Sequence, residues 1–167
     1  MNVPVLSFSQ SITMTVNGER VTRQVAARTH LIDFLREDLG LTGSHIGCEH
    51  GVCGACTIRV NGKAIRGCLI LAVQADGAKV ETIEGLTDSG VIADLQEEFV
   101  NRNALQCGFC TPGMLTTAAE LLEQNASPTR DEIRDAISGN YCRCTGYHSV
   151  VDAIEKVAKT RRTGKSR

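Results

Sequence analysis

Eight cysteines in 167 residues are the part of this sequence best suited to chemistry. Cys48, Cys53 and Cys56 follow a C-x4-C-x2-C spacing in one loop, and Cys68 lies twelve positions beyond Cys56. This is the ligand spacing of plant-type [2Fe-2S] sites, where a short loop wraps three thiolates around a small inorganic core. Glycines within the loop permit left-handed backbone and leave room for N–H groups to approach the sulfurs. The spacing therefore predicts a [2Fe-2S] cluster.

Three other kinds of site could use some or all of these four cysteines. A structural zinc site also uses four thiolates, although it usually pairs short C-x2-C knuckles, and disulfides are rare in a reducing compartment. A Rieske centre needs a second cysteine followed by a histidine, whereas Cys68 is followed by Leu69. His45 and His50 are interpreted as loop residues that face solvent or hydrogen-bond to the backbone. The Rieske interpretation fails, and zinc and disulfides remain open alternatives.

The other four cysteines form a second set. Cys107 and Cys110 are spaced C-x2-C, Cys142 and Cys144 are spaced C-x-C, and 31 residues separate the two pairs. Each pair stands just before a predicted helix, whose free N–H groups and dipole stabilise ionised sulfur. Two such helix starts facing each other could hold one further cluster. A thioredoxin-like redox pair would require a preceding strand, but the residues before Cys107 are helical in pattern, and free structural thiols are the other alternative.

The first half of the sequence predicts a mixed sheet of four or five strands with one helix packed against it. The helix is expected from Thr29, a suitable N-cap, to Leu39, where apolar residues recur at helical spacing. Asn-Gly turns are expected to close two hairpins, and a further strand follows them. Strands are expected at 11–16, 20–26, 57–60, 63–70 and 80–83.

After residue 84 the apolar pattern becomes helical. We expect Thr111 to cap a helix with Pro112 in its first turn, and Thr129 and Glu132 to form a capping box. Helices are expected at 92–100, 112–122, 129–138 and 149–159. The fold class is thus α+β, with one domain at 1–84 and a helical domain at 85–167, each holding four cysteines.

Composition limits the function classes that remain. A hydrophobic content of 42% supports a packed core, although Trp is absent and aromatic residues make up only 4%. The N-terminus lacks the features of a secretory signal, and no apolar run is long enough for a membrane span, so we expect a cytoplasmic protein. Residues 156–167 carry six basic and no acidic residues. A basic C-terminal tail that is frayed, or that rests on an acidic neighbour, explains this better than nucleic-acid binding.

Three motifs together resemble the iron–sulfur part of the xanthine oxidase family of molybdenum hydroxylases. They are GCEHGVCGACTIRVNG at 47–62, LQCGFCTPGM at 105–114 and GNYCRCTGY at 139–147. They occur in the family's order and contain all eight cysteines, and the resemblance extends from about residue 9 to about residue 160. It implies a plant-type ferredoxin-like β-grasp domain followed by an all-α four-helix domain. Because the chain holds only these two domains, it resembles the separate small subunits of bacterial enzymes such as carbon monoxide dehydrogenase and quinoline or isoquinoline oxidoreductase.

The resemblance also implies a role for each site. The cysteines at 107, 110, 142 and 144 would bind the cluster nearer molybdenum, and those at 48, 53, 56 and 68 the cluster nearer FAD. Gln106 would hydrogen-bond the molybdenum pterin cofactor held by a large subunit, and FAD would lie in a medium subunit, in a dimer of heterotrimers. Phe109, Pro112 and Met114 would contact the large subunit, or else Phe109 and Met114 would belong to the chain's own helical core.

The function expected from these observations is electron relay. Two [2Fe-2S] clusters would carry electrons from a molybdenum centre to FAD, in an enzyme acting on an N-heteroaromatic compound, an aldehyde or CO. No acid, base or nucleophile is expected in this chain, and Glu49 and His50 are interpreted as solvated loop residues. The rival functions are an independent ferredoxin-type carrier and a zinc-binding interaction module. The substrate and the terminal electron acceptor depend on other polypeptides.

Overall fold

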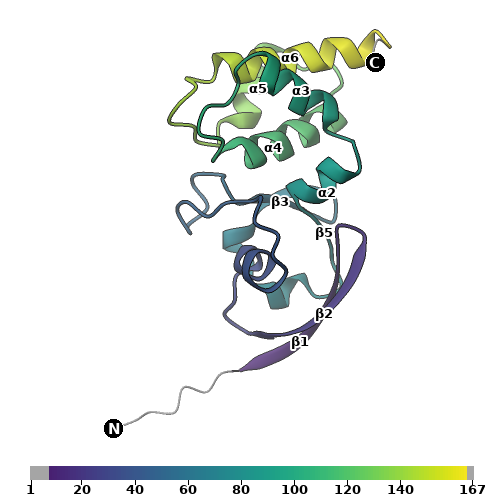
Figure 1. The fold of residues 1–167 in the computed structure, drawn as a ribbon, viewed down its shortest axis with the longest axis vertical. Helices are drawn as coiled ribbons and strands as arrows, with labels where there is room; N and C mark the ends of the chain where they lie inside the picture. Colours follow the sequence, from purple (N-terminus) through teal and green to yellow (C-terminus); the bar gives the residue numbers. More distant parts are fainter. Residues whose placement is uncertain (1–7, 165–167) are drawn as a thin grey trace.

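A five-stranded mixed sheet forms the first half of the chain in the computed structural model, which describes residues 8–164 (Figure 1). The strand order is β2-β1-β5-β3-β4, with β1 and β5 parallel and the other neighbouring pairs antiparallel. Asn17 and Gly18 both have positive φ, as an Asn-Gly hairpin turn requires. The predicted mixed sheet and both hairpins are confirmed. The strands are β1 Ser9–Val16, β2 Glu19–Ala26, β3 Thr57–Val60, β4 Lys63–Arg66 and β5 Lys79–Glu81.

The second hairpin ends earlier than predicted. The strand expected over 63–70 stops at Arg66, and a 3-10 turn at Gly67–Leu69 follows it. The N–H of Gly67 donates to the carbonyl of Cys56 at 3.1 Å, which turns the chain inward and buries Cys68. The chain therefore bends at Gly67 instead of continuing the strand, and the bend places the thiol of Cys68 in the core.

One helix packs against the sheet. It begins as α1, Leu31–Asp33, and continues as a π-helical turn at Phe34–Asp38. Four of its apolar side chains are fully buried in the core between this helix and the sheet. The predicted cap at Thr29 is wrong, because the main chain of Thr29 is bonded to Ala26 and Ala72, and His30 occupies the cap position.

Five helices make up the second half as far as the structure describes it, to residue 164. The four predicted helices are present, and the capping box of Thr129 and Glu132 is confirmed. The expectation of only four helices is not met, since Ile83, expected to end a strand, starts the short helix α2. The predicted cap at Thr111 is also wrong, because Cys110 is the N-cap and Thr111 the first helical residue. The helices are α2 Ile83–Asp88, α3 Ala93–Asn101, α4 Thr111–Gln124, α5 Arg130–Ile137 and α6 His148–Arg162.

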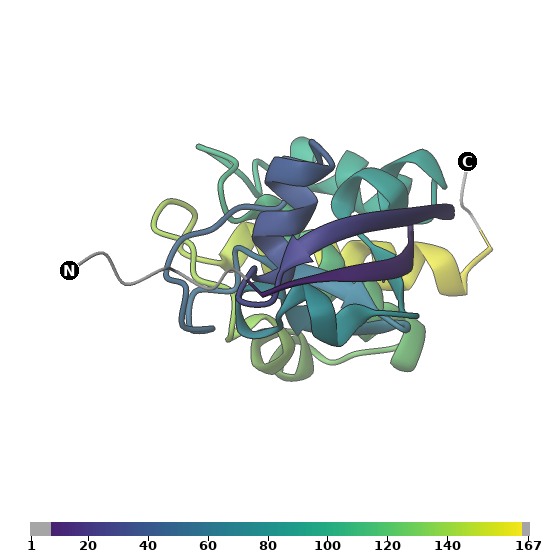
Figure 2. The same ribbon diagram turned by 90° about the horizontal axis from the view of Figure 1, so that it is seen from below.

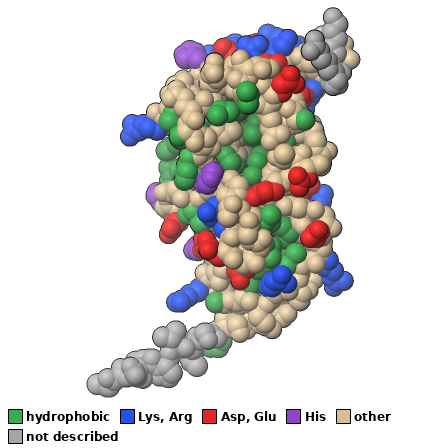
Figure 3. All heavy atoms as spheres, viewed as in Figure 1, with side chains coloured by type: hydrophobic (Ala, Val, Ile, Leu, Met, Phe, Trp, Pro, Cys, Tyr) green, Lys and Arg blue, Asp and Glu red, His purple; other side chains and the backbone are tan. Residues whose placement is uncertain are grey.

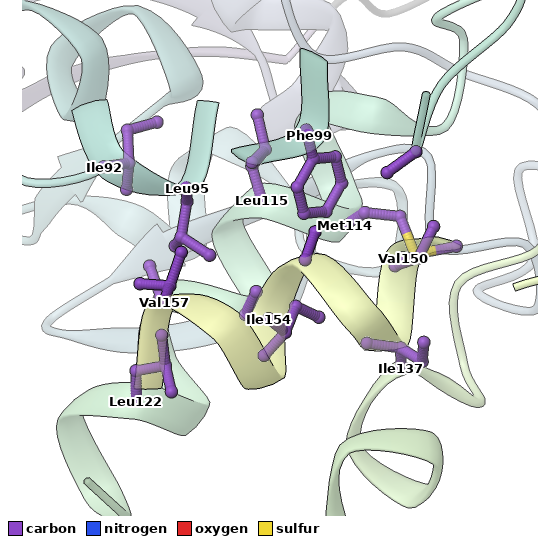
Figure 4. Packing of buried hydrophobic residues seen from close by; sticks show 14 of the residues in the cluster. Ile92, Leu95, Phe99, Met114, Leu115, Leu122, Ile137, Val150, Ile154 and Val157 are labelled. Carbon is purple, nitrogen blue, oxygen red and sulfur yellow. The ribbon is translucent and has the colours of Figure 1, made fainter. Parts of the chain in front are cut away.

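Each half has its own apolar core. Figure 4 shows α6 side chains such as Ile154 and Val157 meeting Leu95 of α3 and Leu122 of α4. The fully buried Phe99 packs in the same cluster. The first core lies between the sheet and α1. The helical half therefore sits beside the sheet as a separately packed layer, and α4 is its main contact with β3 (Figure 1).

The surface carries its charge unevenly. One group of Lys and Arg side chains lies at the helical end of the molecule, and others are spread over the visible face (Figure 3). The last turn of α6 carries Lys159, Arg161 and Arg162. The remainder of the predicted basic tail, 165–167, lies outside the described residues. Among residues 8–164 there is no helix with the length and apolar character needed to span a membrane.

Candidate iron–sulfur sites

Loops from both halves gather on one flank of the molecule. The loop at 43–56, the turn at 104–110 and the loop at 139–147 lie on the same side in two perpendicular views (Figures 1 and 2). These three segments, together with the 3-10 turn after β4, carry all eight cysteines, and every one is a free thiol. The fold therefore collects the predicted ligands from distant parts of the sequence onto one side.

The first four cysteines lie close together as two pairs. Cys48 and Cys53 are hydrogen-bonded through their thiols, and the N–H of Cys53 donates to the sulfur of Cys48 at 3.4 Å. Cys56 and Cys68 form the second pair, both buried, with their thiols hydrogen-bonded to each other. We call these four residues the loop site.

The backbone of the loop site favours negative charge on Cys48. N–H groups of Cys53 and His50 lower the pKa of Cys48 to about 6. Burial raises the pKa of Cys68 to about 11, and the neighbouring Cys56 adds to that rise. Four thiolates this close together repel one another, so a positively charged core among them would relieve a cost that the protein alone does not offset.

The second four cysteines also form two pairs. The sulfurs of Cys107 and Cys144 are 3.6 Å apart, and the thiols of Cys110 and Cys142 are hydrogen-bonded. Cys110 caps α4, while Cys142 and Cys144 lie a few residues before α6. Burial raises the pKa of Cys110 to about 12. We call these four residues the helix-start site.

Cys142 is surrounded by hydrogen-bond donors. Its sulfur accepts from the N–H of Cys144 at 3.4 Å, and from the N–H and the hydroxyl of Thr145 at 3.3 and 3.1 Å. Burial opposes ionisation, but these donors hold the pKa of Cys142 below its usual value. Three donors on one sulfur therefore favour the thiolate form of Cys142.

The arrangement in pairs fits a two-iron core. Two thiolates on one tetrahedral metal ion, each at about 2.3 Å, lie about 3.8 Å apart, close to the Cys107–Cys144 separation. Two thiol pairs per site match two irons with two thiolates each.

The two sites meet at a seam between the halves. The N–H of Tyr141, next to Cys142, donates to the carbonyl of Cys53 at 2.8 Å. The buried Asn140 donates to the carbonyl of Gly54 at 3.1 Å. A Cβ added to Gly113 would stand 2.3 Å from that same carbonyl, so backbone meets backbone here and only glycine fits. The seam therefore fixes the two sites relative to each other.

Further contacts strengthen the seam. Arg66 donates to the carbonyl of Gly139 at 2.7 Å. The buried Arg59 of β3 forms an ion pair with Glu123 of α4 at 2.9 Å. The ring of His45 stacks on Phe109 with centroids 4.5 Å apart, and its Nδ1 lies 2.9 Å from the Phe109 carbonyl.

The other residues singled out in the sequence differ in exposure and in their contacts. Gln106 is exposed, and its side-chain nitrogen donates to the carbonyl of Cys144 at 3.1 Å, so its oxygen stays available. His50 is exposed and bonded to the carbonyl of Cys48. Met114 is fully buried in the helical core, whereas Phe109 is exposed. Glu49 is an exposed loop residue with positive φ.

Sequence reasoning missed the residues that support the sites. Asn140 joins the halves across 86 positions of sequence, so spacing could not reveal it. Thr145 and Tyr147 bond to Cys142, and the signal available was a hydroxyl residue directly after the C-x-C pair.

Comparisons with known proteins agree with this arrangement. Residues 14–83 match a family described as the 2Fe-2S iron-sulfur cluster binding domain, and residues 82–155 match the [2Fe-2S] binding domain. The nicotine 6-hydroxylase small subunit of Paenarthrobacter nicotinovorans is 54% identical over 92% of this chain and 93% of its own length. The caffeine dehydrogenase subunit gamma of Pseudomonas sp. (strain CBB1) is 50% identical over 95% and 96%.

Solved structures share the fold. The crystal structure of quinoline 2-oxidoreductase from Pseudomonas putida 86 contains a chain with 51% identity and a TM-score of 0.87, covering 95% of this chain and 99% of that one. The aldehyde oxidoreductase from Desulfovibrio gigas matches at 40% identity and a TM-score of 0.84 over 93% of this chain, but only 18% of its own. The same pair of regions therefore occurs both as a separate chain and as part of a longer one.

Proposed function

Because this chain belongs to the family of small iron–sulfur subunits of molybdenum hydroxylases, we propose that it relays electrons through two [2Fe-2S] clusters from a molybdenum-pterin centre to FAD. The two sites, each built from two thiol pairs, are the observation that carries the proposal. When bound, each cluster takes up and gives back one electron at a time. The chain itself contributes ligands, fixed separation and tuning of potential.

Each cluster has its own four ligands in this proposal. Cys48, Cys53, Cys56 and Cys68 hold the first cluster, and Cys107, Cys110, Cys142 and Cys144 hold the second. The thiol pairs support this division, since no hydrogen bond joins a thiol of one set to a thiol of the other within the described residues. The domains are accordingly 1–84, a β-grasp domain, and 85–167, in which α3 to α6 form a four-helix core and α2 serves as the connection.

The helix-start site faces molybdenum in this proposal, and the loop site faces FAD. Exposure of Cys107 and Gln106 on the flank that carries the ligand loops supports this order, because a partner can cover them directly. Gln106 would use its free side-chain oxygen to accept a hydrogen bond from the pterin, while its nitrogen stays on Cys144.

The names of the relatives, which are subunits of larger enzymes, support an assembly with partner subunits. We propose a large subunit with molybdenum and a medium subunit with FAD, assembled as a dimer of heterotrimers in the cytoplasm. Hydrophobic side chains exposed on the flank with the ligand loops suit such a cover (Figure 3). The substrate class we favour is an N-heteroaromatic compound, as the names of the nicotine, caffeine and quinoline enzymes suggest.

Anaerobic purification of the chain with its partners tests the proposal. We expect iron and inorganic sulfide in the amounts of two two-iron clusters per chain, two distinct EPR signals after reduction, and copurification of two larger subunits. A colourless, zinc-loaded protein would refute the cluster assignment. A two-cluster protein that purifies alone and exchanges electrons with several partners would instead make it an independent carrier.

A further inference from the structure

We propose that Thr145 sets the reduction potential of the second cluster through the hydrogen bond from its hydroxyl to the sulfur of Cys142, and that Tyr147 holds this hydroxyl in place. The inference rests on the proposed function in one respect, namely that Cys142 is a cluster ligand. It concerns side chains that bind no metal themselves but touch the ligand directly.

The hydrogen-bond network fixes the direction of the Thr145 hydroxyl. The N–H of Tyr147 lies 3.3 Å from the Thr145 oxygen and can only donate to it. A hydroxyl has a single proton, and the sulfur of Cys142 lies 3.1 Å away. The proton therefore points at sulfur, and the hydroxyl acts as a donor to the ligand.

Tyr147 is held in a backbone conformation that a bulky residue rarely adopts. Its φ is 70°, in the left-handed region, which is strained at a residue other than glycine. Its ring packs against the helical core, and its phenolic oxygen accepts the N–H of Cys142 at 2.8 Å. Tyr147 therefore contacts the turn at two points. Its N–H orients the hydroxyl of Thr145, and its phenolic oxygen fixes the backbone of Cys142.

The hydroxyl matters more to the reduced cluster than to the oxidised one. Reduction adds one negative charge that is shared with the ligand sulfurs, so a donor on sulfur stabilises the reduced state preferentially and raises the potential. Apart from the thiol of Cys110, itself a proposed ligand, Thr145 supplies two of the three donors on Cys142, and its hydroxyl is the one that a substitution can remove.

At the loop site, no side-chain hydroxyl of the described residues donates to the sulfur of Cys48. Apart from the thiol of Cys53, itself a proposed ligand, the donors on the Cys48 sulfur are the N–H groups of Cys53, His50 and Val52, which every residue except proline provides. A side-chain substitution there leaves the donors in place. The potential of the second cluster is therefore open to adjustment through one side chain, while that of the first follows from the path of its loop.

The test is a redox titration of the assembled enzyme carrying Thr145→Val, which keeps the shape of the side chain and loses the hydroxyl. Thr145→Ser, which keeps the hydroxyl, is the matched control. Dithionite supplies one electron per cluster in the presence of mediators, and each cluster is followed by its own EPR signal. For Thr145→Val we expect one signal to become about tenfold harder to reduce, a shift of about 59 mV to lower potential. The other signal should not move, and Thr145→Ser should match the unmodified enzyme.

Each other result overturns the inference. An unchanged potential in Thr145→Val, a shift in both signals, or an equal shift in Thr145→Ser means that the hydroxyl does not tune the cluster. If Thr145→Val loses the cluster, Thr145→Ala relieves any crowding and is titrated in its place. If Thr145→Val and Thr145→Ala both lose the signal of the second cluster while Thr145→Ser retains it, the hydroxyl is needed to bind the cluster and does not tune it. Absence of two clusters in the unmodified enzyme would refute the proposed function itself.

Discussion

The two cysteine sites are built in opposite ways. The loop site gathers three of its four cysteines within nine residues, and backbone N–H groups donate to Cys48. The helix-start site joins two pairs that are 31 residues apart, and a side-chain hydroxyl donates to Cys142. A local loop can make a site by its own path, whereas a site assembled from helices depends on the packing that brings those helices together. Substitutions should therefore affect the two sites unequally.

The largest expected effect separates the sites by their place in the relay. Cys110→Ser should remove the second cluster, leave the first intact, and slow the reduction of flavin by substrate at least about a hundredfold, or about 2.7 kcal/mol in the barrier. Stopped-flow spectroscopy and EPR of the assembled enzyme measure both quantities. The matched variant is Cys56→Ser, in which substrate should still reduce the second cluster but not flavin. Unimpaired flavin reduction in Cys110→Ser would contradict the proposed order.

A smaller effect is expected where the halves touch. Alanine in place of a helical glycine usually stabilises a protein by up to about 1 kcal/mol. At Gly113 we expect the reverse, a loss of about 1–3 kcal/mol in the free energy of unfolding, because the new Cβ would stand 2.3 Å from the Gly54 carbonyl. Denaturant titration of the chain measures the loss. Glu97→Ala on the exposed side of α3 should change stability by less than about 0.5 kcal/mol, and an equal effect of the two variants would argue against the seam.

Asn140 tests the same seam through hydrogen bonding. Asn140→Ala removes the donor to Gly54 and the acceptor for Thr117, so the buried carbonyl of Gly54 loses a partner. We expect a cost of about 1–2 kcal/mol, measured by denaturant titration. The exposed Asn101 provides a control, because its replacement by alanine leaves the seam unchanged. A cost confined to one half, seen as a split unfolding transition, would show that the seam does not couple them.

The smallest expected effect belongs to the helical half alone. Arg161 of α6 makes two bonds of 2.7 Å to Asp94 of α3. Burial raises the pKa of Asp94, but Arg161 outweighs it and holds that pKa below its usual value. The folded pKa is depressed, so the stabilisation is present above the ordinary pKa of aspartate and is lost as pH falls through the folded pKa. We expect about 1 kcal/mol at neutral pH.

Thermal unfolding at several pH values checks this contribution of Arg161 and Asp94. Asp94→Asn should abolish that part of the acid sensitivity. It should leave the loop site unaffected, because both partners lie in the second half.

Features carried by neighbouring residues could be predicted from the sequence. The spacing of Cys48, Cys53 and Cys56 indicated the loop site directly, and the capping box at Thr129 marked the start of α5. The two hairpins and the mixed sheet could be predicted from the alternation of apolar and polar residues and from the Asn-Gly turns. Family membership, first indicated by three motifs, agrees with the relatives found.

Features that depend on distant contacts could not be predicted. Thr29 has the right side chain for a cap, but Ala72, far along the chain, engages its carbonyl and moves the helix start. The strand after Lys63 reads as continuous, yet Gly67 bonds to Cys56 and ends it. α2 was missed because it is only six residues long and contains a glycine. In each case a tertiary contact or a short length outweighs local propensity.

The hydrogen bond from Tyr141 to Cys53 has a consequence for how such chains can be exchanged between enzymes. Each ligand loop supplies part of the other's scaffold, so a chimera that takes one loop from a relative and keeps the other inherits a mismatched joint. Grafting experiments should move both loops with Gly54, Gly113 and Asn140 as a set. The two cysteine sites should therefore be exchanged together, even though each half of the chain has its own core.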